Sequence, residues 1–182
     1  MMPLVYLSPS TQEFNFFING GSEEYWMNLV ADEVEPYLIA SGIDFVRNTP
    51  EMNARESIEQ SNAVGADLHV AIHSNSSPVE LSGVLLGPDI YFDPADEDSL
   101  EMARLTQNNF RGIYPNPIKV DIRPTDYLGE VLNTNAPSVL IETAYHDNID
   151  DAEWIQKNVR PIGRAIAKSI AEYFNVPFVE AT

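Results

Sequence analysis

The strongest constraint on the fold is an alternation between short, almost wholly apolar runs and longer segments in which apolar residues recur at helical spacing. The apolar runs, rich in β-branched residues, occupy 3–8, 43–48, 67–73, 83–92 (interrupted at Gly87-Pro88) and 137–143. Helical spacing marks residues 23–41, 51–63, 97–113 and 150–174. Strands that are apolar throughout are typical of parallel sheets covered by helices on both faces. The order therefore predicts one α/β domain over residues 1–182, a sandwich in which helices flank a mostly parallel, mixed central sheet.

Two of the helical segments carry more specific expectations. Pro36 lies inside the first pattern, and we expect it to kink that helix or end it early. The last pattern begins with the acidic stretch DNIDDAE, which complements the positive end of a helix dipole. We therefore expect one long helix over 150–174.

The charge balance excludes several classes of partner. The chain has 28 acidic and 10 basic residues, for a formal net charge of −18. Binding to nucleic acid without sequence preference needs many Lys and Arg side chains, so we expect no nucleic-acid partner. No apolar stretch approaches the roughly 18 residues of a membrane span, and MMPLVYLSPS lacks the basic and apolar regions of a signal peptide. We therefore expect no membrane span and no leader in this sequence, which leaves its location open.

The absence of cysteine narrows the chemistry further. Any metal ion would have to be held by His, Asp, Glu or neutral oxygen donors. The sequence also lacks a dinucleotide-binding glycine fingerprint, a phosphate-binding loop, a G-x-S-x-G elbow and an H-E-x-x-H motif. What remains is a set of polar residues at the ends of predicted strands, where open α/β sheets build their sites.

His73 ends the apolar run in ADLHVAIHSNSS. An imidazole at this position can ligate a metal ion through one nitrogen, or it can simply be satisfied by hydrogen bonds from the loop. His69 shares a face of the same strand but lies roughly 13 Å away in regular β geometry. The two histidines therefore cannot bind one ion, and we expect His69 to face the core or a helix.

Glu142 follows the apolar run SVLI and emerges at the end of a predicted central strand. A carboxylate there is a surface residue, or else it needs a partner, a metal ion or a role in proton transfer. His146 and Asp147 come just after it and can face the same crevice, although HDN also suits a turn and a helix cap. Glu23 and Glu24 open the first predicted helix, where acidic residues favour the helix dipole.

Taken together, these stretches resemble the zinc-dependent N-acetylmuramoyl-L-alanine amidases, which cut bacterial peptidoglycan. GADLHVAIHSNSS is similar to that family's strand ending in S-I-H-x-N, and APSVLIETAYHDN to its P-A-V-L-V-E-x-G-F strand. EEYWMNLVADEVEPYLIASGIDFVRN is similar to its glutamate-led helix and the next strand, and RAIAKSIAEYF to its terminal helix. The resemblance runs over nearly the whole chain in the same order. It implies a sheet flanked by helices, with zinc at the strand ends.

The resemblance also implies roles for individual residues. His73 and Glu24 would bind zinc, and Glu142 would activate the water. The family's first zinc ligand is a histidine in a D-x-G-H-G-G turn, but here the turn reads LSPSTQEFN, with Thr11 at that position. Threonine is not a usual zinc ligand. The site has therefore either lost its metal or gained a ligand from elsewhere.

We expect His146 to be the third zinc ligand, because it stands where the family usually has an apolar residue; Gln12 and Glu13 are the alternatives. The family's strand arginine is replaced as well, by Leu132, so contacts with the substrate are expected to differ. The candidate substrate contacts are Asn75, Ser76, Thr143 and Tyr145.

The reaction implied by the resemblance is zinc-dependent hydrolysis of the amide bond between N-acetylmuramic acid and L-alanine, with peptidoglycan or a muropeptide as substrate. Glu142 would act as general base and then as general acid. Two other functions stay open. One is a degenerate domain that binds peptidoglycan or a regulator without cutting it. The other is a zinc amidohydrolase or carboxypeptidase that acts on small acylated amino acids or peptides.

Overall fold

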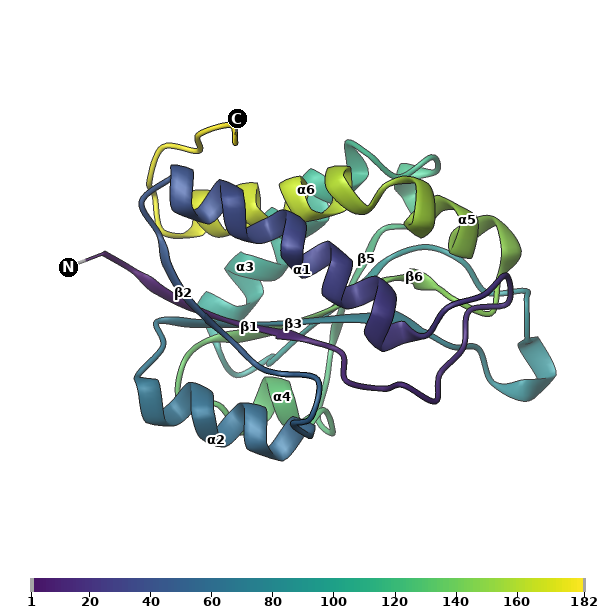
Figure 1. Cartoon of the computed structure of the whole chain (residues 1–182), viewed down its shortest axis with the longest axis horizontal. Coiled ribbons are helices and arrows are strands. Elements are labelled where there is room, and N and C mark those ends of the chain that lie inside the picture. The colour runs from purple at the N-terminus through teal and green to yellow at the C-terminus, as the bar shows by residue number, and fades with distance from the viewer. Residues whose placement is uncertain (1, 182) are drawn as a thin grey trace.

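In the computed structural model, which describes residues 2–181, a six-stranded sheet lies between two layers of helices (Figure 1). The strands are β1 (Leu4–Pro9), β2 (Asp44–Arg47), β3 (Leu68–Asn75), β4 (Asp89–Phe92), β5 (Asp121–Pro124) and β6 (Ser138–Tyr145). The α-helices are α1 (Glu23–Ala40), α2 (Ala54–Val64), α3 (Glu97–Arg111), α4 (Gly129–Leu132), α5 (Ile149–Lys157) and α6 (Val159–Tyr173). Two short 3-10 helices, η1 (Val79–Leu81) and η2 (Pro117–Lys119), lie in the loops.

The sheet has the order β2-β1-β3-β6-β4-β5. Every neighbouring pair is parallel except β4 and β6, which run antiparallel, so the prediction of a mostly parallel, mixed sheet is confirmed. The most apolar strands, β3 and β6, are neighbours at the centre. Their carboxyl ends therefore meet at one edge, with His73 opposite Glu142 in the β3–β6 register.

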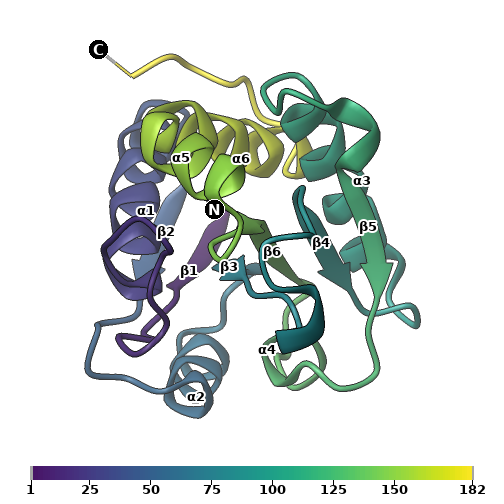
Figure 2. The ribbon, with the colours of Figure 1, turned by 90° about the vertical axis from the view of Figure 1, so that its right-hand side faces the viewer.

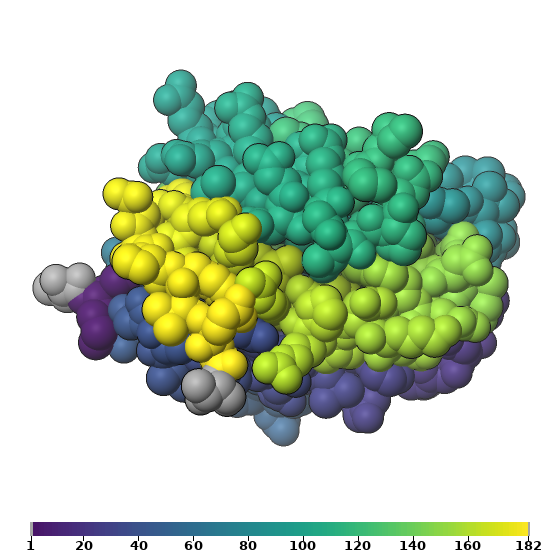
Figure 3. Space-filling view, turned by 90° about the horizontal axis from the view of Figure 1, so that it is seen from above, coloured from purple at the N-terminus to yellow at the C-terminus, as the bar shows by residue number. Residues whose placement is uncertain are grey.

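The two faces of the sheet are covered differently (Figure 2). Helices α1, α3, α5 and α6 lie on one face, and the main hydrophobic core fills the space beneath them. The outer surface of this layer shows α3, α6 and the C-terminal segment side by side (Figure 3). Gly163 lets α6 approach α1 closely, because a side-chain carbon at this position would lie 2.6 Å from Glu33 Cβ and 3.0 Å from the Val30 carbonyl oxygen. Within residues 2–181, α2 and α4 cover the other face, whose apolar cluster is much smaller.

The first helix differs from the expectation for Pro36, because α1 continues past this residue to Ala40. Proline removes the hydrogen bond to the carbonyl one turn earlier, at Asp32. Both Pro36 and Asp32 are on the exposed side of the helix, so water can satisfy that carbonyl. The Ser22 side chain caps the start of α1 by accepting a hydrogen bond from the Tyr25 amide.

The predicted single helix over 150–174 is wrong, since α5 and α6 are separated at Asn158. Pro161 has no amide hydrogen to continue the helical ladder, and its ring would clash with the carbonyl of Lys157. Asn158 also bonds the backbone locally, because its Nδ2 atom donates to the Trp154 carbonyl at 2.7 Å. The chain therefore changes direction between two shorter helices.

The predicted strand over 83–92 is confirmed only for Asp89–Phe92. Gly87 has a φ of +103°, and a side chain there would collide with the Lys119 carbonyl oxygen, so the chain turns before β4 begins. The sequence patterns missed β5 and α4 altogether. Within residues 2–181, no helix has the length and apolarity that crossing a membrane would need.

Candidate functional site

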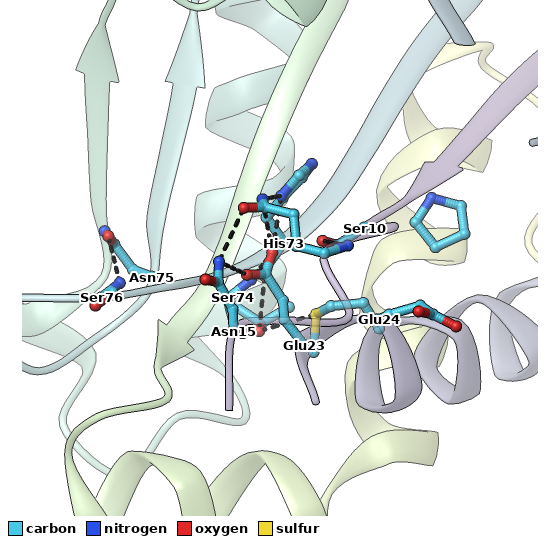
Figure 4. Close-up of polar contacts among 12 residues, drawn as sticks. Ser10, Asn15, Glu23, Glu24, His73, Ser74, Asn75 and Ser76 are labelled. Carbon is cyan, nitrogen blue, oxygen red and sulfur yellow. Dashed lines mark hydrogen bonds and ion pairs between the residues drawn. The ribbon is translucent and has the colours of Figure 1, made fainter. Parts of the chain in front are cut away.

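Glu23 and His73 meet at the carboxyl end of the sheet. The Nδ1 atom of His73 lies 2.9 Å from Glu23 Oε1, and Glu23 is only 1% exposed. Figure 4 shows Glu23 directed toward His73 and Glu24 turned away from it. Successive helix residues are about 100° apart around the axis, so only one of these two acids can face β3. The carboxylate beside His73 is therefore that of Glu23, whereas the sequence analysis expected Glu24.

The loop after β1 supplies amide groups to this pair. Asn15 Nδ2 donates to Glu23 Oε2 at 2.9 Å. Gln12 Nε2 lies 3.5 Å from Glu23 Oε1 and 3.3 Å from His73 Nδ1. Burial by itself would raise the pKa of Glu23, but the hydrogen bond and charge of His73 and the bond from Asn15 outweigh it and lower that pKa. Glu23 is thus held as a carboxylate.

Glu130, which the sequence analysis did not single out, occupies the other side of the histidine. Its Oε2 atom lies 3.3 Å from His73 Nε2, while its Oε1 atom accepts from Ser8 Oγ at 2.5 Å and lies 3.4 Å from His69 Nε2. Glu130 comes from the four-residue helix α4 and is 6% exposed. His69 is fully buried and faces this helix, which confirms its predicted place.

The two carboxylates act on the charge of the imidazole. Burial alone would lower the pKa of His73, but the hydrogen bonds and charges of Glu130 and Glu23 raise it well above its ordinary value. Burial alone would raise the pKa of Glu130, yet the hydrogen bonds of His69 and His73 and their charges hold it far below the usual range. These shifts favour a protonated imidazole between two carboxylates.

Glu142 stands next to His73 on the sheet and has different surroundings. It is opposite His73 in the β3–β6 register and opposite Asp89 in the β4–β6 register. Its Oε2 atom is buried and has no hydrogen-bond partner among residues 2–181. Burial raises its pKa to about 8; His73 works against this rise, and Glu23 and Asp89 add to it. The Glu142 carboxyl can therefore bind or release a proton close to neutral pH.

The raised pKa leads to a stability prediction for Glu142→Gln. The folded-state pKa of about 8 lies above the ordinary value of 4.5, so the stability contributed by protonated Glu142 is full below pH 4.5 and is lost as the pH rises through 8. Glutamine carries no ionisable group, so the variant should unfold at a higher temperature than the wild type at pH 9 and show no such advantage at pH 4.5. Thermal unfolding of chelator-treated protein between these pH values checks this.

The matched control for this prediction is Glu101→Gln, which changes an exposed glutamate of α3. It should follow the wild type at every pH. A difference between Glu142→Gln and the wild type that stays constant with pH would contradict the raised pKa.

His146 lies apart from Glu23 and His73. Its Nδ1 atom is 3.0 Å from both the Oγ and the carbonyl oxygen of Ser74, and its ring stacks on Phe17 with centroids 5.5 Å apart. Neighbouring residues of a strand point to opposite faces, so the Ser74 side chain draws His146 to the face away from His73. This placement differs from the expectation of a third zinc ligand.

The rest of the turn after His146 has structural partners. Asp147 accepts hydrogen bonds from the amides of Ser77 and Gly83, both at 3.0 Å. Asn148 caps α5, because its side chain accepts from the amides of residues 150 and 151. The turn-and-cap interpretation of HDN is confirmed for these two residues.

The candidate substrate contacts lie in several environments. Asn75 and Ser76 follow His73 at the end of β3, where the Ser76 amide donates to Asn75 Oδ1 at 2.8 Å (Figure 4). Tyr145 is buried, and its hydroxyl donates to Asp89 Oδ2 at 3.2 Å. Thr143 is fully buried and donates to the His73 carbonyl at 3.0 Å. Thr143 differs from the expectation because it points to the face opposite Glu142.

A cleft of about 410 Å³ gives access to His73 and Glu130. Gln12 and Phe14 from the loop after β1 line it, together with Asn53 at the start of α2. Glu13 lines a separate hollow beside Glu24. Within residues 2–181, no three His, Cys, Asp or Glu side chains converge as a metal site would require. The cleft is thus lined by the His73 imidazole, the Glu130 carboxylate and the Gln12 amide.

The chain is similar to known proteins in both sequence and fold. The family model described as N-acetylmuramoyl-L-alanine amidase matches residues 13–172. Among solved structures, the amidase AmiC2 of Nostoc punctiforme is similar, with 19% identity, a TM-score of 0.84 and coverage of 95% of this chain and 97% of that one. The catalytic domain of CwlV, an amidase from Bacillus (Paenibacillus) polymyxa var. colistinus, has 20% identity, a TM-score of 0.83 and coverage of 97% and 100%. A search among curated proteins finds no match. At these identities the structural similarity establishes the fold alone.

Proposed function

Because this chain belongs to the N-acetylmuramoyl-L-alanine amidase family, we propose that it hydrolyses the amide bond between N-acetylmuramic acid and L-alanine with the help of zinc and Glu142. One observation carries the finer part of this proposal. Glu142, with a buried carboxyl oxygen that has no partner among residues 2–181, stands directly across from the His73–Glu23 pair. A buried carboxyl without a partner beside potential metal ligands is typical of a proton-transfer group.

The chemical types of the donor atoms at this site support the proposal of zinc. Imidazole nitrogen and carboxylate oxygen are both preferred zinc ligands. His73 Nδ1 and Glu23 Oε1 are 2.9 Å apart, so both atoms can reach one ion. Gln12 Nε2 lies within 3.5 Å of both residues, and Gln12 Oε1 accepts from Asn15 Nδ2 at 2.8 Å. Our proposed third donor is the Gln12 amide oxygen, which requires the amide group to turn over. Zinc bound here would supply a Lewis acid that polarises the scissile carbonyl and lowers the pKa of water.

Side chains of the protein carry out the proton transfers. Glu142 takes a proton from the attacking water, since its carboxyl binds a proton near neutral pH. It then returns this proton to the nitrogen of L-alanine as the carbon–nitrogen bond breaks, so that a lactyl carboxylate and a free amine are formed. Asp89, opposite Glu142 on β4, adds negative charge that favours protonation of Glu142.

The proposal is tested by identifying the products formed from purified peptidoglycan. We expect soluble peptides with a free L-alanine amine, detected by mass spectrometry after amine labelling, and glycan strands that keep intact muramoyl lactyl groups. Removing zinc with a chelator should abolish the reaction, and adding zinc back should restore it.

Three outcomes would contradict the proposal. Cleavage of a different bond would exclude the amidase assignment, and full activity in chelator would exclude zinc. Sedimentation of the protein with intact peptidoglycan, with no new amine, would favour the non-catalytic binder. A small N-acyl amino acid, tested in parallel, separates the amidase from a general amidohydrolase.

A further inference from the structure

We propose that a hollow between α3 and α6, in the layer of helices opposite α2 and α4, binds a small polyanion that carries two or more phosphate groups. Among the residues that the structure describes, this hollow shares no lining residue with the cleft beside His73. The inference therefore adds a second binding site to the chain, and it does not depend on zinc or on hydrolytic activity.

The lining of this hollow is positively charged. It has a volume of about 530 Å³ and lies between α3 and α6, which Figure 3 shows side by side. Arg160, Arg164 and Lys168 line it from α6, and the amides of Asn108 and Asn109 line it from α3. Within residues 2–181 no acidic side chain lines it, although the chain has 28 acidic and only 10 basic residues. Three of the few cations of a strongly acidic protein therefore gather at one hollow.

The stability of α6 does not account for this arrangement. Residues four apart lie on one face of a helix, so the three cations form a row and repel one another. From Arg160 to Lys168 the row extends about 12 Å along the helix axis. Arg160 also lies in the first turn of α6, where the helix dipole disfavours positive charge, and its Nε atom donates to the buried Tyr37 hydroxyl at 3.3 Å. An anion bound along the row would relieve the repulsion.

The C-terminal segment already places one carboxylate against this row. Arg164 Nε lies 3.0 Å from both carboxylate oxygens of Glu180, and Arg164 Nη2 also contacts that carboxylate. The guanidinium carbon of Arg164 lies 5.1 Å from the ring centroid of Phe178, and the Val179 amide donates to Ser41 Oγ at 3.0 Å. Glu180 is therefore an internal competitor, because its carboxylate occupies the Arg164 nitrogens that an external anion would use.

The acidic partners of the three cations can be exchanged for a ligand. Glu33 lies 3.9 Å from Arg160, and Glu172 lies 3.5 Å from Lys168. The side chains of Glu33, Glu172 and Glu180 are 39%, 38% and 60% exposed. Ion pairs of exposed side chains contribute little to stability, so a ligand of higher charge can displace them.

The chemistry of the row favours phosphate over carboxylate. A terminal phosphate group carries nearly two charges and three acceptor oxygens at neutral pH, so neighbouring cations can share it. The planar fork of arginine matches phosphate oxygens, and lysine adds a point charge. A carboxylate offers two oxygens and one charge. We therefore expect a diphosphate to bind more tightly than a tricarboxylate such as citrate.

The experiment titrates the full chain with inorganic diphosphate at low ionic strength and follows the backbone amide signals by two-dimensional NMR. The protein is treated with chelator beforehand, so that diphosphate cannot act by removing a metal ion. We expect saturable shifts in α6, at the end of α3 and in the C-terminal segment. A parallel titration with citrate should show weaker binding.

Four variants test the residues of the row. Arg160→Gln and Arg164→Gln should each raise the Kd for diphosphate about tenfold, as expected for the loss of a charge-assisted hydrogen bond. Arg55→Gln removes one positive charge from the exposed surface of α2 and should bind diphosphate like the wild type. Glu180→Gln should lower the Kd by up to about fivefold, because the internal competitor is lost.

A further control and the contrary outcomes complete the design. Glu80→Gln, at an exposed position of η1, changes the net charge as Glu180→Gln does and should leave the Kd unchanged. Absence of saturable binding, or shifts centred elsewhere on the chain, would overturn the proposal. An unchanged Kd in Arg160→Gln and Arg164→Gln, or an equal rise in Arg55→Gln, would also overturn it. Citrate bound as tightly as diphosphate would overturn the assignment to phosphate. Failure of this site leaves the proposed hydrolysis untouched, since the two are measured separately.

Discussion

Replacing Glu142 with glutamine will lower the rate of amide hydrolysis by about 10²- to 10⁴-fold, the range typical for loss of a general acid–base group. Glutamine has nearly the same shape as glutamate, but it cannot take a proton from water or deliver one to the leaving amine. The buried Oε2 of Glu142 has no hydrogen-bond partner within residues 2–181 that the substitution would disturb. The variant should therefore fold and bind zinc like the wild type.

The measurement is kcat on a defined muropeptide, with zinc content determined on the same samples. Glu101→Gln serves again as the control on the surface of α3 and should keep full activity. If Glu142→Gln works at the wild-type rate, another group moves the proton. If it loses zinc along with activity, Glu142 acts in binding the metal, and the proposed division of roles is wrong.

If zinc binds as proposed, His73→Ala should bind no zinc and should lose the hydrolytic activity. The sequence contains 3 histidines, so each can be removed in turn. His73 is the one that lies beside the Glu23 carboxylate, at 2.9 Å, and that opens onto the cleft. His146 stacks on Phe17 and contacts Ser74 instead, so His146→Ala should keep its zinc after mild dialysis.

Metal content, measured by mass spectrometry on the wild type and the two variants, shows which of the two histidines binds zinc. Loss of zinc from His146→Ala, with the fold intact by circular dichroism, would support the ligand set expected from the sequence, with His146 as the third ligand. Retention of zinc by His73→Ala would contradict the proposed site. Gln12→Ala tests the amide as third donor, and it should weaken zinc binding less than His73→Ala does.

The central part of the fold could be predicted from sequence because its signals are local and strong. β3 and β6 are apolar over most of their length, and α1 and α3 show helical spacing. β5 and α4 have only four residues each, in a segment rich in proline, so their structure is decided by the strands on which they pack. The break at Asn158 depends on Pro161 being in the first turn of the next helix, a detail that the apolar spacing of 150–174 conceals.

The part of the site that lies at the ends of apolar strands could be predicted from the sequence. His73 and Glu142 could be found because each closes an apolar run, and the parallel register then places them side by side. The choice between Glu23 and Glu24 depends on the angular phase of α1, which a sequence pattern fixes only to within a residue or two. Glu130 had no signal of its own beyond an acid between apolar neighbours, because its importance arises only when α4 docks under His73.

The close packing of α1 on α6 has a consequence for how this chain folds during synthesis. The two helices begin at Glu23 and Val159, so most of the sequence separates two surfaces that share one core. Until α6 leaves the ribosome, the side of α1 that contacts α6 has no cover. Such long-range closure slows folding and leaves a partly made chain open to aggregation or to capture by chaperones. The layer that supports Glu23 is therefore completed only when one of the last elements of the domain arrives.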